Sequence, residues 1–218
     1  MASVVDICNI ALAHLGDEAS VSAIDPPDGS AQAGHCKRFY PIARDALIES
    51  HNWQFATKRE PLALLSATPP ANWSYVYAYP NCLRMIGVFP PDEVVPTAAI
   101  FADDERSLLA KPVPFEIEAI PDGTLVIYTN MENATAAFVV SISDTSKFSP
   151  LVVLAMARFL ASLLAGPILK GTEGIKISEA HLKAYEQLDL PRAKRADATA
   201  RYTDVFDKFI PSHLAARS

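Results

Sequence analysis

The segment FYPIARDALIESHNWQFATKR, from Phe39 to Arg59, contains the change from a helical to a strand pattern on which the predicted domain organisation depends. It begins with the spacing of an amphipathic helix, carries Pro41 inside that helix, and passes without a glycine into an aromatic segment around Trp53. A proline inside a helix removes one backbone hydrogen bond and presses on the carbonyl four residues before it, so we expect a kink or a short break. The stretch therefore predicts a long helix, near residues 30–51, that leads directly into a β segment.

The pattern after Trp53 is that of short strands. Runs rich in aromatic and β-branched residues alternate with clusters of Pro, Asn, Gly and Asp. The run FEIEAIPDGTLVIYTN, residues 115–130, predicts a hairpin that turns at its Pro-Asp-Gly segment. Residues 53–148 are thus expected to form a small antiparallel β domain, with Trp53 and Phe55 buried at the hinge where the chain enters it.

Helical patterns lie on both sides of this β segment. A helix is expected near residues 3–15, where Ser3 is a suitable N-cap, and another near 150–165, with Ser149 as N-cap and Pro150 at its first position. Residues 166–176 are expected to connect it to a last helix, from Ser178 to about residue 202, which Pro191 kinks or splits. Each helix has an apolar face that needs cover. The predicted fold is α+β: an antiparallel helical bundle of residues 1–52 and 149–203, an inserted antiparallel β domain, and a C-terminal tail of residues 204–218.

Composition narrows the class of protein. Half of the 218 residues are hydrophobic and 20% are charged, which is typical of a globular domain. The net charge of -6 argues against a dedicated nucleic-acid binder. The most apolar stretch, Leu151 to Leu169, carries Arg158 near its middle, which favours a buried helix over a membrane span. The first residues lack the pattern of a signal peptide, so synthesis in a cytoplasm is expected.

No motif in the sequence points to catalysis. The segment from Gly171 to Ser178 lacks the spacing of a phosphate-binding loop, the histidines are scattered singly, and the acidic clusters are typical of solvated turns. We therefore predict a protein that is not an enzyme and that holds no metal or cofactor.

The C-terminal part offers a candidate interface instead. The last predicted helix carries Arg192, Lys194 and Arg195, and five apolar residues follow in the tail: Val205, Phe206, Phe209, Ile210 and Leu214. The tail either folds back on its own bundle or acts as a clasp, in which Phe206, Phe209 and Ile210 enter a groove of another protein while the three cations meet acidic groups there.

Three segments together resemble a known family. An opening helix ends in Leu12, Leu15 and Gly16, a second helix carries Arg44, Asp45 and Leu47, and an aromatic signature H-x-W-x-F follows at His51, Trp53 and Phe55. Their order, followed by an apolar and then a charged helix, is similar to the tail tubular protein A family, the head-to-tail adaptors of short-tailed bacteriophages.

The resemblance implies a structural virion protein of the tail or neck. Its expected partners are the portal protein above, a tail nozzle ring similar to tail tubular protein B below, tail fibres around the outside, and copies of itself in a ring of twelve. DNA would pass through the ring's channel during ejection without specific binding, and no membrane is involved. An acidic wall suits this channel, because it repels DNA phosphates.

Two other functions stay open at this point. One is a virion-associated cell-wall hydrolase that uses a carboxylate such as Glu105 or Glu116. The other is a different head-completion or tail-terminator protein.

Overall fold

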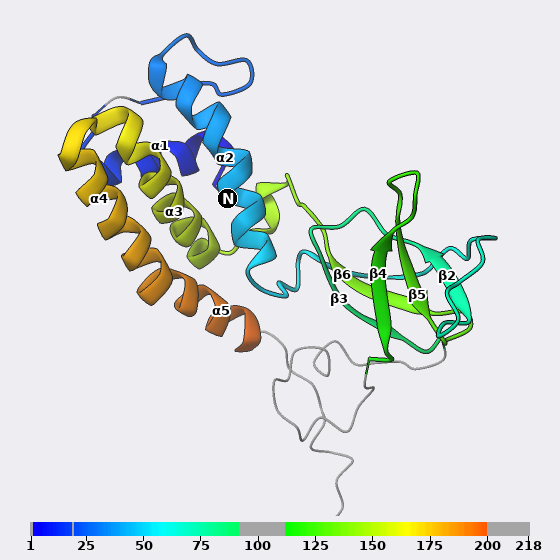
Figure 1. Cartoon of the computed structure of the whole chain (residues 1–218). Helices are drawn as coiled ribbons and strands as arrows, with labels where there is room; N and C mark the ends of the chain where they lie inside the picture. Colours follow the sequence, from blue (N-terminus) through cyan, green and yellow to red (C-terminus); the bar gives the residue numbers. More distant parts are fainter. Residues whose placement is uncertain (1, 19, 92–111, 200–218) are drawn as a thin grey trace, which may run out of the picture. The chain divides into compact units, whose positions relative to one another are not determined.

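The computed structural model describes residues 2–18, 20–91 and 112–199 of the chain. It is a mixed α+β structure with 46% of residues in helices, 19% in strands, and two small antiparallel sheets (Figure 1). The α+β class predicted from the sequence is therefore confirmed.

The first helix, α1 (Val4–His14), is determined by local signals at both of its ends. The Ser3 hydroxyl accepts from the Asp6 amide, while the Asp6 carboxylate accepts from the Ser3 amide, which makes a complete capping box. The chain leaves the helix at Gly16, whose φ of 73° is a conformation that glycine adopts at little cost. Both ends match the sequence prediction.

Helix α2 (Ala31–Glu49) runs through Pro41 without a break. The predicted break is therefore absent from the described helix. Pro41 lies on the exposed side of α2, where water can bind the carbonyl that loses its helical partner. The opposite side carries buried residues, among them Cys36, Ala43 and Leu47.

Helix α3 (Pro150–Leu169) is the core of the helical part, and it packs against α1, α2 and α4. It begins as predicted, with Ser149 as N-cap and Pro150 in the first turn. Among the described residues it is the one helix long and apolar enough to cross a membrane, and 56% of its most apolar window is buried within the protein. The core helix of a folded domain has these same properties.

The connection after α3 differs from the prediction. Helix α3 continues through Gly166 and Pro167, the chain turns at Lys170 (φ 58°), and α4 (Gly171–Ala184) begins seven residues before the predicted start at Ser178. Close packing explains the early start, because a Cβ on Gly174 would lie only 2.9 Å from the Ala165 carbonyl of α3. Gly174, which lies in the segment expected to connect the helices, instead lets two helices approach closely.

The predicted last helix is divided. A π-helical turn (Tyr185–Asp189) separates α4 from α5 (Leu190–Thr199). Pro191 therefore enters at the start of α5, directly after a widened turn that accommodates the proline. The widened turn lies before the proline, and helical turns continue from Gly171 to Thr199, so Pro191 does not end the helix (Figure 1).

The strands form two sheets of three. One has the order β1-β6-β3, with β1 Thr57–Pro61, β6 Thr135–Val139 and β3 Arg84–Phe89. The other has the order β2-β5-β4, with β2 Tyr75–Ala78, β5 Leu125–Thr129 and β4 Phe115–Ala119. Strands β4 and β5 are antiparallel with Ile117 opposite Ile127, and Gly123 (φ 85°) lies in their turn, so the predicted hairpin is confirmed.

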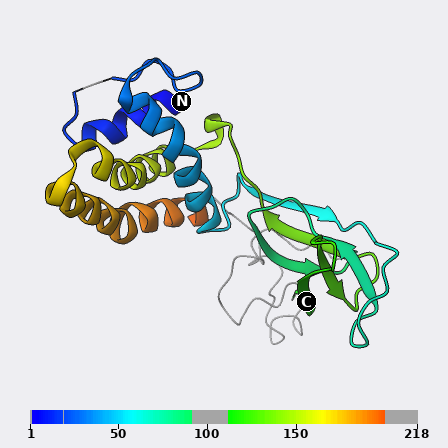
Figure 2. The same ribbon diagram turned by 45° about the horizontal axis from the view of Figure 1, so that its top comes forward.

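The chain divides into two compact units. Among the described residues, the helical unit comprises residues 2–18, 20–59, 81–85 and 137–197, and the β unit comprises residues 60–80, 86–91, 112–136 and 198–199. Figure 2 shows the helices of the first unit and the strands of the sheets from a second direction.

A short 3-10 turn (Thr145–Lys147) precedes α3.

Candidate functional site at the C-terminal end of α2

The aromatic signature lies directly after α2 and within the helical unit. Trp53 is 0% exposed, and its indole Nε1 donates to the Leu47 carbonyl at 3.0 Å. The Ser50 hydroxyl donates to the same carbonyl at 2.7 Å. The last carbonyls of a helix have no partner within the helix, so these two bonds cap the end of α2.

The rings of the signature contact one another in series. His51 meets Trp53 edge-on with ring centroids 4.9 Å apart, and Trp53 stacks on Phe55 at 5.8 Å. Phe55 in turn contacts Phe148, just before α3, at 5.3 Å. Phe55 is half-buried, so the prediction of complete burial is confirmed for Trp53 and wrong for Phe55.

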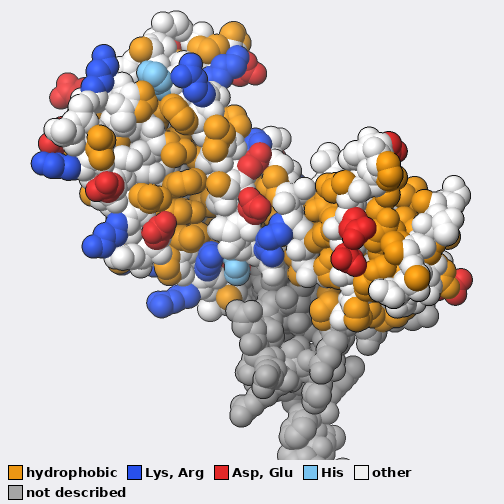
Figure 3. All heavy atoms as spheres, viewed as in Figure 1, with side chains coloured by type: hydrophobic (Ala, Val, Ile, Leu, Met, Phe, Trp, Pro, Cys, Tyr) orange, Lys and Arg blue, Asp and Glu red, His pale blue; other side chains and the backbone are white. Residues whose placement is uncertain are grey.

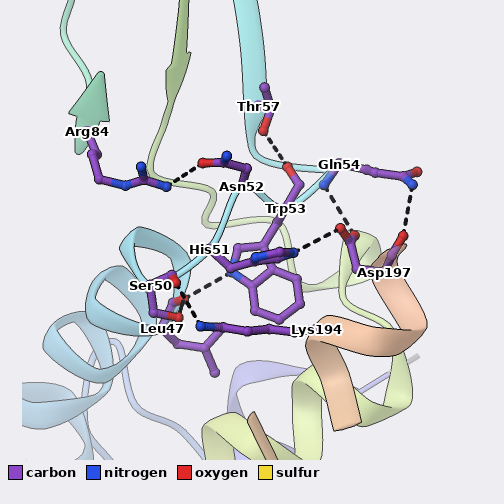
Figure 4. A network of polar contacts seen from close by, with 10 residues as sticks. All are labelled: Leu47, Ser50, His51, Asn52, Trp53, Gln54, Thr57, Arg84, Lys194 and Asp197. Atoms are coloured by element: carbon purple, nitrogen blue, oxygen red, sulfur yellow. Dashed lines mark hydrogen bonds and ion pairs between the residues drawn. The ribbon is translucent and has the colours of Figure 1, made fainter. Parts of the chain in front are cut away.

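Helix α5 is bound to the same segment by polar contacts (Figure 4). The Gln54 amide donates to the Asp197 carboxylate at 3.2 Å, and the Gln54 side chain donates to the Asp197 carbonyl at 3.0 Å. His51 Nε2 lies 3.6 Å from the other oxygen of that carboxylate. These contacts hold the last described turn of α5 against the segment that follows α2.

Two cations complete this network. Lys194 Nζ donates to the Ser50 carbonyl at 2.9 Å, and burial, together with nearby Arg84, lowers the pKa of Lys194. Arg84 donates from Nε to the Glu49 carbonyl at 3.1 Å and also to the Asn52 side chain. Positive groups at the carbonyl end of a helix are favourable. Both side chains therefore stabilise the end of α2.

The Arg-Asp pair of the second helix has a similar structural role. Arg44 Nε lies 2.8 Å from Asp45 Oδ1, and the Ser141 hydroxyl donates to that oxygen at 2.7 Å. Burial raises the pKa of Asp45, but hydrogen bonds from Arg44 and Ser141 outweigh this effect and lower it overall. The pair ties α2 to the segment before α3.

The predicted interface residues are distributed unevenly. Arg192 and Arg195 are exposed on α5, whereas Lys194 is half-buried and bonded to Ser50. Phe206, Phe209 and Ile210 lie outside the described residues, as does Glu105. Glu116, the other carboxylate considered for hydrolysis, is exposed on β4 and accepts a hydrogen bond from Trp73 Nε1 at 3.1 Å.

Sequence reasoning missed a cluster that joins α1, α3, α4 and the π-helical turn. Arg158 Nε donates to Asp189 at 3.0 Å, Arg158 also lies 3.4 Å from His181 Nδ1, and His181 Nε2 lies 3.1 Å from the His14 carbonyl. Burial and the charge of Arg158 lower the pKa of both histidines. Arg158, a lone charge in an apolar helix, was the signal that could have indicated it.

The described residues contain no group of three or more His, Cys, Asp or Glu side chains that could hold a metal ion. An open, mainly apolar groove of about 480 Å³ lies between α1, α2 and the loop around Ile24. Its rim carries the ion pair of Lys37 with Asp25 at 2.9 Å. This lining offers apolar contact surface.

In comparisons with known proteins, no protein-family model matches this sequence, and no curated protein matches it at a significant level.

Proposed function

We propose that this protein is a structural head-to-tail adaptor of a phage virion. In this role it forms a ring beneath the portal, connects the portal to the tail nozzle, and surrounds the channel through which DNA leaves the head. It is made in the host cytoplasm and acts in the tail or neck of the particle. It acts through its surfaces and performs no catalysis.

One observation carries this proposal. The residues that resemble the adaptor family all have structural tasks in one unit: His51, Trp53 and Phe55 form the aromatic series, and Arg44 with Asp45 forms a bonded pair. A motif of this kind supports a rigid scaffold, in which buried rings and fully paired charges hold the elements in one arrangement. Rigidity is what a ring subunit under the pressure of packaged DNA requires.

We infer further that residues 1–52 and 149–203 form an antiparallel bundle, with residues 53–148 as the inserted β domain. The helical unit also contains residues 53–59, 81–85 and 137–148. Packing of α3 against α1, α2 and α4 supports a bundle. The segment after α2 is then where the chain leaves the bundle, and its network holds this segment within the helical unit.

The C-terminal tail contributes a clasp in this account. Phe206, Phe209 and Ile210 anchor in a groove of the portal or of a neighbouring subunit. The clasp hypothesis assigned Arg192, Lys194 and Arg195 to the same contact. Because Lys194 already binds Ser50, we now assign the intermolecular charge contacts to Arg192 and Arg195.

The proposal is tested in the virus that encodes the protein. Particles made without it are expected to contain heads that package DNA but lack tails, because the connector between portal and nozzle is missing. Complete particles that attach to cells and fail only at penetration of the cell wall would contradict the adaptor role and favour a hydrolase. Glu105→Gln, at the other carboxylate considered for hydrolysis, is expected to leave tail assembly intact.

A further inference from the structure

Strand β4 presents an acidic face next to an aromatic ring. Glu116 and Glu118 alternate with Ile117, so both carboxylates project from one side of the strand, and both are exposed. β4 is the edge strand of its sheet. The Trp73 indole donates to Glu116 at 3.1 Å and packs against the buried cluster of Val76, Val126 and Tyr128. We call Trp73, Glu116 and Glu118 the acidic strand face.

No Lys or Arg among the described residues of the β unit compensates the charge of this face. The described residues of the β unit (60–80, 86–91, 112–136 and 198–199) contain no Lys or Arg, and their five acidic residues are Glu60, Glu116, Glu118, Asp122 and Glu132. Figure 3 shows acidic groups surrounded by apolar surface on this unit. Such a surface attracts a cationic partner.

The chemistry of the acidic strand face suits arginine. The hydrogen bond to Glu116 fixes the indole of Trp73, and the ring is half-buried, so part of it stays accessible. A planar guanidinium stacks on an aromatic face and forms two parallel hydrogen bonds with a carboxylate. A ring and a carboxylate that are already joined can therefore receive one arginine, and Glu118 can receive a second.

Helix α5 and the turn before it present the complementary groups. Leu188, Arg192 and Arg195 follow the spacing i, i+4 and i+7, which places them along one side, and all three are exposed. Within the part of the chain that the structure describes, neither arginine makes a hydrogen bond or an ion pair. We call these three residues the basic helix stripe.

We infer that the acidic strand face of one copy binds the basic helix stripe of a neighbouring copy. The spacings match, because alternate residues of a strand are about 7 Å apart and residues three apart on a helix are about 5–6 Å apart. Arg192 and Arg195 thus reach Glu116 and Glu118 together, with Leu188 against apolar surface. This contact deepens the proposed function, on which it rests, by naming the interface between ring subunits.

The two surfaces differ, so the contact is head-to-tail. Each copy contributes its acidic strand face to one contact and its basic helix stripe to another, and such heterologous contacts close into rings when the rotation fits. A symmetric contact between two acidic strand faces is disfavoured, because like charges would oppose each other.

Cross-linking between different molecules tests this contact. One variant carries Ala119→Cys beside the acidic strand face, and another carries Ala198→Cys beyond the basic helix stripe, both in a Cys82→Ser background, since Cys8 and Cys36 are buried. The two full-length variants are mixed and treated with a bismaleimide. A product that contains one copy of each variant is expected, even where the free contact is weak, because the reagent traps encounters.

Charge reversal then identifies the groups involved. Glu116→Arg with Glu118→Arg in the first variant is expected to reduce the yield by about tenfold or more, and Arg192→Glu with Arg195→Glu in the second is expected to do the same. With both reversals present the yield recovers, which also shows that the variants fold. The matched control, Lys176→Glu with Lys183→Glu on α4, leaves the yield within about twofold.

The outcomes separate this inference from the proposed function. The head-to-tail contact is overturned by any of three results: no mixed product, a yield that the reversals do not change, or no recovery in the double reversal. These results are expected if the acidic strand face binds another basic protein, or the basic helix stripe of its own chain, instead of a neighbouring copy. Tailless particles from the deletion experiment would still support the adaptor role. Conversely, recovery in the double reversal together with normal tails in the deletion would retain the contact and refute the adaptor.

Discussion

Replacement of Trp53 by alanine tests whether the aromatic signature anchors the helical unit. Trp53 is the largest fully buried side chain among the described residues, and its indole Nε1 donates to the Leu47 carbonyl at 3.0 Å. Trp53→Ala removes this buried ring and leaves the carbonyl with one partner fewer. We expect it to lower the free energy of unfolding by about 3–5 kcal/mol. Trp53→Phe keeps a ring and loses only the N–H, so a loss of about 1–3 kcal/mol is expected.

The assay is thermal unfolding followed by far-ultraviolet circular dichroism, which reports the helices. In a chain of this size about 1 kcal/mol shifts the Tm by roughly 2–4 °C, so Trp53→Ala is expected to lower it by about 6–20 °C. Trp73→Ala is the matched control, because Trp73 is half-buried in the β unit and should affect the helical transition far less. If Trp53→Ala has the same Tm as the wild-type protein, Trp53 does not anchor the helical unit.

Three further outcomes are expected. Burial lowers the pKa of His14 and His181, so the folded state binds fewer protons than the unfolded state as the pH drops from 7 through about 6.5. The urea midpoint of unfolding should therefore fall over this pH range. The fall should be smaller in His181→Gln, which lacks one of the two titrating groups. Lys194→Met should lower the free energy of unfolding by about 1–2 kcal/mol, because it removes the hydrogen bond to the Ser50 carbonyl. An unchanged urea midpoint would show that this hydrogen bond does not contribute to stability. Deletion of residues 204–218 should weaken docking to the portal without changing the melting temperature, and unchanged affinity in a binding titration would refute the clasp.

The parts of the fold that were predicted correctly depend on neighbouring residues. The caps at Ser3 and Ser149, the hairpin turn at Gly123, and the change to strands after Trp53 all follow from a few adjacent side chains. These signals act through local backbone geometry, so the sequence alone indicates them.

The parts that were missed depend on contacts distant in sequence. Gly174 appeared to be a loop residue, yet it lies where α4 packs against Ala165. The break, one of the two alternatives predicted at Pro41, does not occur in α2, and Lys194, which was expected to face a partner, binds the end of α2. In each case tertiary packing, which no local pattern displays, decided the outcome.

The most direct test of the central claim is a cryo-electron microscopy reconstruction of the neck of the virion. The adaptor account predicts a ring of this protein directly beneath the portal, with twelve copies, the nozzle below it, and Glu116 and Glu118 of each copy next to Arg192 and Arg195 of the next. A neck in which another protein occupies the position beneath the portal, or a particle that contains this chain only at the tail tip, would contradict it.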